Sequence, residues 1–229
     1  MTGLAKNVAM VCDRIAAAAR RSGRQPEDVT LVAVTKTISP DVIREAVAAG
    51  IKELGENRVQ ELLRKQPFIT GVNWHLIGHL QRNKVRQVWD KVTMIHSVDS
   101  LRLAQELDKR AGQAGARVNI LIEVNVAGEE TKFGVAPEAL IPLCKELTGY
   151  KALNVCGLMT VAPLATDAEE VRPVFRRLAE LRREVEALRL PGMGELPYLS
   201  MGMSADFEVA IEEGANLVRI GTTIFGPRD

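Results

Sequence analysis

The sequence predicts one closed (β/α)₈ barrel of the TIM type, preceded by an N-terminal helix. Short apolar runs alternate with amphipathic stretches along the 229 residues, and about eight such units follow the opening helix. Nearly continuous apolar runs are typical of parallel strands that helices cover on both faces, and eight units in this length fit a compact barrel. No long Gly-, Ser- or Pro-rich linker divides the chain, so residues 1–229 are expected to form a single domain. A doubly wound open sheet is the alternative fold.

The first unit carries clear local signals. Apolar residues open the chain at helical spacing, at Leu4, Val8, Val11 and Ile15. A β-branched, largely apolar strand is expected over residues 30–35. Ser39 followed by Pro40 is typical of an N-cap with proline at the first helical position. The order predicted here is therefore helix, strand, helix.

The same alternation continues to the end of the chain. Further strands are expected near residues 51–54, 74–77, 92–95, 118–126, 155–159, 196–199 and 217–220. The clearest helix is expected over about residues 167–189, because apolar residues recur there every three or four positions. Thr166 with Glu169 fits a capping box at its start.

Composition excludes several classes of function. Lys and Arg total 30 against 29 Asp and Glu, a net charge of +1, so the basic excess of a typical nucleic-acid-binding protein is missing. The start of the chain lacks the pattern of a signal peptide, and no run reaches the roughly 18 apolar residues of a membrane span. The three cysteines, Cys12, Cys144 and Cys156, lie far apart and are expected to be small buried thiols of a reducing compartment. A cytoplasmic location is expected.

Lys36 is the sharpest candidate for chemistry. It follows an apolar strand directly, at the strand end where a barrel of this kind builds its site. Partial burial there favours the neutral amine, the form in which lysine attacks carbonyl groups. The alternative is a lysine that reaches solvent or pairs with a carboxylate such as Glu56.

Two late segments are candidates for phosphate binding. Residues 199–204 and 220–223 each end a strand with small, hydroxyl-bearing residues, and the loops after the last two strands of such barrels often bind phosphate. Ordinary N-capping by Ser204 and Thr222 is the alternative. Arg219 lies inside an apolar strand, so its guanidinium needs an acceptor, either a ligand atom or a carboxylate such as Glu123.

The two histidines His75 and His79 are four residues apart, but this spacing does not predict a metal site. Gly78 and the strand-to-loop setting break the helical geometry that would align the two rings, and no adjacent pair of acidic ligands is present. His75 alternates with Trp74 and Leu76 and is expected to face the barrel interior as a core histidine.

The chain resembles the pyridoxal phosphate homeostasis proteins, whose fold is like the N-terminal barrel of alanine racemase, a fold type III pyridoxal phosphate (PLP) barrel. The matching stretches lie in order along nearly the whole chain, at residues 33–36, 55–61, 74–81, 97–100, 157–159, 199–206 and 218–222. Two departures, Arg58 where an aromatic residue is common and Phe133 where a small one is usual, affect only expectations about the pocket rim.

The resemblance implies a set of cofactor-binding residues. It implies that Lys36 forms the internal aldimine, that Asn57 lines the pocket near the ring, and that Arg219 faces the pyridine nitrogen. It also implies a phosphate cradle of Ser200, Gly202, Gly221 and Thr222. A cation opposite the ring nitrogen disfavours ring protonation, so the cofactor is a poorer electron sink than with an aspartate there.

Three functions remain open at this point, and a non-enzymatic PLP carrier that supplies apo-enzymes is favoured. An amino-acid racemase of this fold needs a second acid/base, a tyrosine from a further C-terminal domain. The chain ends at Asp229, and neither Tyr150 nor Tyr198 is an obvious substitute. A Schiff-base aldolase that uses Lys36 without a cofactor is the third candidate function.

The resemblance to the family also implies a monomer. Transfer of the cofactor aldehyde from Lys36 to Lys132 is a less favoured hypothesis.

Overall fold

A computed structural model, which describes residues 2–227, contains a closed barrel of eight strands. The strands are β1 (Thr30–Val34), β2 (Glu53–Glu56), β3 (Asn73–Leu76), β4 (Met94–Val98), β5 (Val118–Glu123), β6 (Leu153–Met159), β7 (Tyr198–Ser200) and β8 (Leu217–Ile220). Each pairs in parallel with its neighbours in sequence order, and β8 closes the ring on β1. The predicted (β/α)₈ barrel is confirmed, and the open-sheet alternative is wrong.

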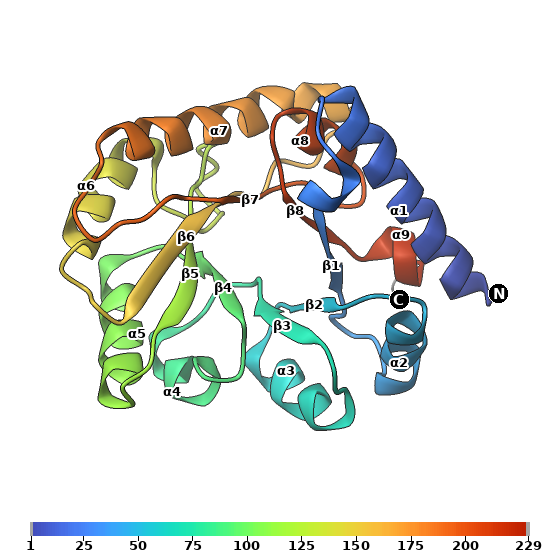
Figure 1. The fold of residues 1–229 in the computed structure, drawn as a ribbon, viewed down its shortest axis with the longest axis horizontal. Coiled ribbons are helices and arrows are strands. Elements are labelled where there is room, and N and C mark those ends of the chain that lie inside the picture. The colour runs from blue at the N-terminus through green and yellow to red at the C-terminus, as the bar shows by residue number, and fades with distance from the viewer. Residues whose placement is uncertain (1, 228–229) are drawn as a thin grey trace.

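Helices surround the strands (Figure 1). The α-helices are α1 (Gly3–Arg21), α2 (Pro40–Ala48), α3 (Val59–Lys65), α4 (Val85–Val88), α5 (Leu101–Gln113), α6 (Pro137–Leu147), α7 (Arg172–Ala187), α8 (Phe207–Glu212) and α9 (Thr222–Phe225). Short 3₁₀ turns complete the connections at Pro26–Asp28, Gln66–Phe68, Arg82–Lys84 and Ala168–Val171.

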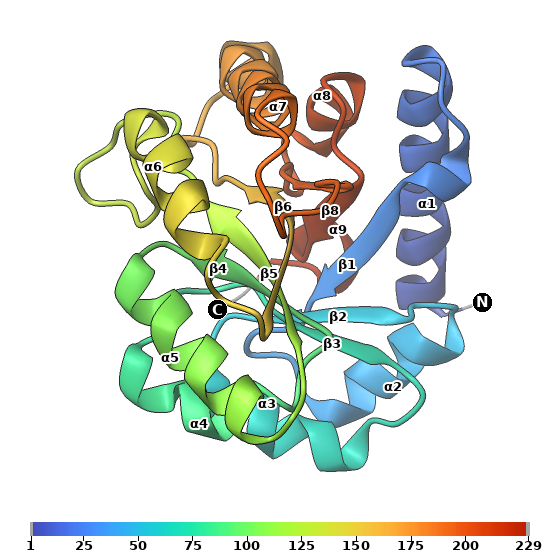
Figure 2. The same cartoon turned by 60° about the vertical axis from the view of Figure 1, so that its left-hand side comes forward.

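The opening helix α1 packs along the outside of the barrel beside α8 and α9 (Figures 1 and 2). Its buried stripe includes Val8, Val11 and Ile15, as the spacing predicts. Polar contacts fix its position, since Arg14 forms an ion pair of 2.7 Å with Glu208 on α8. The helix therefore covers the part of the wall that the last two helices leave open.

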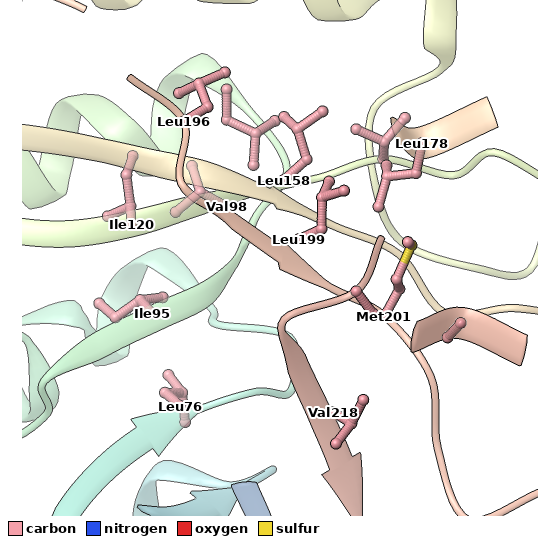
Figure 3. Packing of buried hydrophobic residues seen from close by; sticks show 14 of the residues in the cluster. Leu76, Ile95, Val98, Ile120, Leu158, Leu178, Leu196, Leu199, Met201 and Val218 are labelled. Carbon is pink, nitrogen blue, oxygen red and sulfur yellow. The ribbon is translucent and has the colours of Figure 1, made fainter. Parts of the chain in front are cut away.

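Alternation along the strands separates two apolar layers. The larger cluster joins outward-facing strand residues to the helices, and Figure 3 shows part of it, with Leu158 and Leu199 from adjacent strands and Leu178 from α7. A small second cluster lies on the opposite strand face, inside the barrel: Val32, Met94, Leu121, Cys156, Met159 and Leu217. The interior thus has few apolar side chains and leaves room for polar ones.

The ring of strands is uneven. β5 and β6 pair along six positions from Val118 to Glu123, whereas β7 has three residues and shares one register pair with β8, Ser200 with Leu217. Backbone hydrogen bonds of the adjoining residues, such as that from the Arg219 N–H to the Gly202 carbonyl over 3.0 Å, continue this short ladder. The junction of β7 and β8 lies next to the two segments that the sequence predicts for phosphate.

Local expectations were met in part. Ser39 caps α2 with Pro40 in the first turn, as predicted. The capping box of Thr166 with Glu169 is wrong, because Asp167 is the capping residue and accepts from the Glu169 N–H. The α-helix then begins only at Arg172, since Pro173 fits the first turn of a helix but not its interior.

The thiols divide into two kinds. Cys144 and Cys156 are buried as expected, but Cys12 is exposed because it lies one residue beyond the buried position Val11 on α1. Among residues 2–227, no helix combines the length and apolar composition that crossing a bilayer requires.

Candidate functional site

A cavity of about 490 Å³ opens where the carboxyl ends of β1, β2 and β8 meet. It brings together most of the polar residues singled out in the sequence, and its lining includes Lys36, Asn57, Ser204, Arg219, Gly221 and Thr222. A larger hollow of about 560 Å³ lies between the end of α7 and residues 189–197, but it contains none of the predicted site residues. The chemistry therefore concentrates in the cavity at the strand ends, which we call the Lys36 cavity.

Ser200 and Gly202 are the two predicted residues that do not line the Lys36 cavity. The Ser200 side chain is fully buried, and its hydroxyl is occupied inside the barrel. A Cβ on Gly202 would lie 2.6 Å from the Cβ of Ala210, so this glycine permits a close approach to α8. Their predicted contact with phosphate stays a prediction.

Lys36 is the second residue after β1 and is half-buried. Its ammonium has no hydrogen-bond partner among residues 2–227, so it is available to a ligand in the cavity. The next residue, Thr37, adopts a left-handed backbone conformation with φ of 65°, and its N–H donates to Oε2 of Glu61 over 2.8 Å. This turn directs the chain away from the barrel immediately after the lysine.

A buried ion pair between Lys65 and Glu56 lies next to the turn at Lys36 and Thr37 and contacts its backbone at Thr35. The Nζ of Lys65 lies 2.6 Å from Oε1 of Glu56 and donates to the carbonyl of Thr35 over 2.7 Å. Burial raises the pKa of Glu56 against the opposing effect of Lys65. Burial also acts to raise the pKa of Glu61, but the Thr37 N–H and Lys65 outweigh it and lower that pKa. Glu56 is thus the partner of Lys65 and not, as one alternative held, of Lys36.

Backbone donors converge on the far side of the Lys36 cavity. The N–H groups of Gly221 and Thr223 point at the hydroxyl oxygen of Ser204, at 3.3 and 3.4 Å. Ser204 and Thr222 are not the helix caps of the alternative reading, since Asp206 caps α8 and Gly221 caps α9. Ser204 lies in the segment 199–204 that the sequence predicts for phosphate, although the family resemblance does not include it in the cradle, and it lines the cavity.

Arg219 extends from β8 into the barrel and is 4% exposed. Its Nη1 donates to Oγ of Ser200 over 2.6 Å, and its Nη2 donates to the carbonyl of Thr160 over 2.8 Å. Glu123 is not its hydrogen-bond partner, although the carboxylate acts on it through space. Burial lowers the pKa of Arg219 to about 10, with Glu123 and Asp206 opposing, so the guanidinium is a cation at neutral pH.

A second cavity of about 300 Å³ adjoins the first and shares Asn57 with it. Its lining includes Glu123, whose pKa burial raises to about 7 with help from Asp99. Lys132 also lines it, with Nζ 2.6 Å from Oε1 of Glu129. Buried oxygens without a hydrogen-bond partner among residues 2–227 occur on Glu123 and Asn57, so both cavities present acceptors to a ligand.

The three histidines have separate environments. His75 faces the barrel interior, as predicted, where it contacts His96 and Glu53. His79 pairs with Asp99 over 3.1 Å and stacks on Phe133 with a ring distance of 3.8 Å. In the described part of the chain, no three potential metal ligands cluster. No prediction from the sequence covered His96, although it alternates with Ile95 along β4 and shares the interior face of the strand with Met94.

Comparison with known proteins gives a consistent result. A family model described as the alanine racemase N-terminal domain matches residues 11–229. A pyridoxal phosphate homeostasis protein of Aquifex aeolicus is 48% identical, with 97% of each chain covered. The protein of the same name from Escherichia coli K12 is 39% identical, over 100% of this chain and 98% of its own.

Solved structures agree in fold. PipY of Synechococcus elongatus, in a structure described as having PLP bound, is 36% identical and superposes with a TM-score of 0.79 over 97% of this chain and 100% of its own. The alanine racemase of Corynebacterium glutamicum, at 15% identity and a TM-score of 0.70, covers 96% of this chain with 62% of its own length. This last likeness shows the barrel fold alone.

Proposed function

The chain belongs to the family of pyridoxal phosphate homeostasis proteins, and on this premise we propose that it binds pyridoxal 5′-phosphate in the Lys36 cavity. Its proposed task is to hold and supply this cofactor within the cell. The single observation that carries the assignment is the position of a lysine amine, without a partner among residues 2–227, in one cavity with a buried arginine and a group of backbone donors.

The residues present fit such a ligand. A volume of about 490 Å³ lies in the range of small-molecule sites. The N–H groups that now point at Ser204 from Gly221 and Thr223 suit an anion such as phosphate. The side-chain oxygen of Asn57, buried and without a partner in the described chain, suits a donor on the ring.

Each residue has a proposed part in binding. PLP supplies an aldehyde that combines with primary amines and a ring that withdraws electrons. Lys36 holds the aldehyde carbon through Nζ, and Gly221 with Thr222 holds the phosphate. The cationic Arg219 faces the ring nitrogen and disfavours its protonation, which favours storage over catalysis. Ser200 and Gly202 keep their predicted place in the phosphate cradle through the backbone of residues 200–204.

A carrier is proposed in preference to an enzyme. A racemase needs a second proton-transfer group beside the lysine. Neither tyrosine of the chain lines the Lys36 cavity: Tyr198 begins β7, and the Tyr150 hydroxyl accepts a hydrogen bond from Gln105. The names of the relatives favour homeostasis in the same way. A racemase-like enzyme is the second candidate, because the barrel is the one that alanine racemase uses.

The remaining parts of the proposal concern the partners, the oligomeric state, the cellular location and the extent of the domain. PLP-dependent apo-enzymes are the proposed recipients, the protein is proposed to act as a monomer in the cytoplasm, and residues 1–229 are proposed to form one cofactor-binding domain. No nucleic acid or membrane partner is proposed, in keeping with a net charge of +1.

The deciding experiment measures absorbance and intact mass of the protein after incubation with PLP, before and after borohydride reduction. We expect a visible absorbance band that reduction removes and one added reduced pyridoxyl phosphate group that peptide mapping places on Lys36. Lys36→Ala is expected to lose both signals, and Lys145→Ala, which removes an exposed lysine on α6, is expected to keep them. A label on other lysines, or none, contradicts the assignment. Racemisation of alanine or serine above the Lys36→Ala background would favour the second candidate.

A further inference from the structure

A continuous chain of hydrogen bonds crosses the barrel interior and ends on Arg219. The Oε2 of Glu53 lies 2.8 Å from Nε2 of His75, and Nδ1 of His75 lies 2.9 Å from Nε2 of His96. The Nδ1 of His96 lies 2.9 Å from Oγ of Ser200, which accepts from Nη1 of Arg219 over 2.6 Å. Each of the five side chains comes from a different strand, namely β2, β3, β4, β7 and β8.

Four of the five side chains are buried, so the loss of any one of these hydrogen bonds would leave a polar group without a partner and lower the stability of the fold. His96 and Ser200 are fully buried, and His75 and Arg219 are each 4% exposed. Only Glu53, half-buried at the start of β2, reaches solvent. A buried polar group that loses its partner costs about 1–3 kcal/mol, so the five side chains are constrained to act together.

The direction of each hydrogen bond follows from Glu53. A carboxylate only accepts, so Nε2 of His75 donates to Glu53, and the Nδ1 of a neutral His75 accepts from Nε2 of His96. Burial, with His75 and Arg219 nearby, holds the pKa of His96 well below its ordinary value, so its ring is neutral and its Nδ1 accepts from the Ser200 hydroxyl. The Ser200 oxygen is then free to accept from Arg219.

The reverse order does not satisfy all the groups. A His96 ring with a proton on Nδ1, whether neutral or doubly protonated, would donate to the Ser200 oxygen, which already accepts from Arg219. The Ser200 hydrogen would then have no acceptor among residues 2–227. One arrangement, with donors pointing from Arg219 toward Glu53 at every step, is therefore the only one in which all five side chains are satisfied.

We propose that Glu53, His75, His96 and Ser200 form a positioning relay that fixes the guanidinium of Arg219 in one orientation at the Lys36 cavity. The relay holds Nη1 while the Thr160 carbonyl holds Nη2, so the remaining N–H groups are set before a ligand arrives. Such preorganisation lowers the entropy cost of binding. The proposal rests on the proposed function for the identity of the ligand, PLP, but not for the existence of the relay.

The first test uses the protein without cofactor. Long-range ¹H–¹⁵N NMR spectra report which nitrogen of each histidine carries the proton. We expect the Nε2–H form for both His75 and His96, and slow exchange with water of the Arg219 guanidinium protons. An Nδ1–H or doubly protonated His96, or fast guanidinium exchange, overturns the relay whether or not the protein binds PLP.

The second test compares two buried serines. Ser200→Ala breaks the relay, whereas Ser97→Ala removes an equally buried hydroxyl that donates to the Gly78 carbonyl outside it. We expect Ser200→Ala to speed guanidinium exchange and to weaken PLP binding by about 10- to 100-fold, the value of a hydrogen bond to a charged group. Ser97→Ala is expected to change binding less than about twofold on the same scale. Equal effects of the two changes contradict the relay.

Glu53 offers a rescue experiment at the far end. Glu53→Gln keeps an acceptor oxygen for His75 and is expected to preserve both tautomers, while Glu53→Leu removes the acceptor and is expected to disturb the tautomer of His96, which Glu53 does not touch. A His96 signal unchanged in Glu53→Leu overturns the relay. Failure of the wild-type protein to bind PLP contradicts the proposed function alone, because the tautomers, guanidinium exchange and rescue still decide the relay.

Discussion

The Nζ of Lys65 lies 2.6 Å from Oε1 of Glu56, with both side chains buried beside the strand end that leads to Lys36. The same ammonium donates to the Thr35 carbonyl, so the charge pair acts together with the strand ladder, in which the Thr35 N–H donates to the Gly55 carbonyl, to hold the backbone next to the lysine. The position of Lys36 therefore depends on two residues that do not line its cavity.

Breaking this pair on one side is expected to be costly. Lys65→Met leaves the Glu56 carboxyl buried without its cation, and we expect a loss of about 3–5 kcal/mol in the free energy of unfolding. The double change Lys65→Met with Glu56→Leu is expected to recover most of it, because the fully buried charge is gone and Glu61, the second partner of Lys65 at 3.0 Å, keeps the Thr37 N–H as a donor. Urea unfolding measures both, with the exposed Lys145→Met as control. A single variant as stable as the wild type contradicts the account.

Glu123 predicts a pH dependence of stability. Its pKa rises from an ordinary 4.5 to about 7 on folding, so its contribution to stability is present in full below pH 4.5 and is lost as pH rises through about 7. Glu123→Gln removes this loss, and we expect it to stabilise the protein by up to about 3 kcal/mol above pH 7 but little near pH 4.5. Unfolding at a series of pH values tests this. The exposed Glu45→Gln should show no such trend.

Gly78 predicts a steric effect on the site. A Cβ there would lie 2.4 Å from the backbone oxygen of Asn57, a contact that requires the loop after β2 to move. We expect Gly78→Ala to cost about 1–3 kcal/mol of stability and to weaken PLP binding, because Asn57 lines the Lys36 cavity. Gly194→Ala, where nothing lies within 4 Å of the added carbon, is the control. Similar melting temperatures for the two variants would contradict the close approach.

The thiols predict a pattern of chemical modification. Cys12 is exposed, whereas Cys144 and Cys156 are buried, and burial raises the pKa of Cys144 to about 12. An alkylating reagent is expected to add once to the folded protein, at Cys12, and three times in denaturant. Intact mass and peptide mapping measure this. Early modification of Cys144 would show that α6 opens in the native protein.

Much of the site could be predicted because of one geometric rule. In a parallel barrel the strand ends share one face, so residues distant in sequence, such as Lys36, Asn57 and Arg219, are expected to meet there, and they do. The position of the Ser200 side chain did not follow from this rule, because the side chain points into the barrel and does not line the cavity. Side chains alternate between the two faces of a strand, and β7 has only three residues, so an error of one residue in its predicted end assigns a side chain to the wrong face.

Other features depended on contacts that periodicity does not encode. The stripe of α1 predicts which face is buried, but Cys12 lies just outside it, and the general tendency of cysteine to be buried gave the wrong answer. The pair of Lys65 and Glu56 depends on how α3 is rotated against β2, which the spacing of apolar residues fixes only approximately. Hydrogen-bond partners therefore needed the three-dimensional structure.

The junction between β7 and β8 has a consequence for how the barrel stays closed. The two strands share a single register pair, and the adjoining residues add three backbone hydrogen bonds, from the N–H of Met201 to Leu217, of Asn216 to Leu199 and of Arg219 to Gly202. Ser200 and Arg219 stand on the two sides of this junction, and their side chains are joined by a hydrogen bond of 2.6 Å. The guanidinium that lines the cavity therefore also ties the last two strands together, and loss of its bond to Ser200 would weaken the closure of the barrel as well as the cavity.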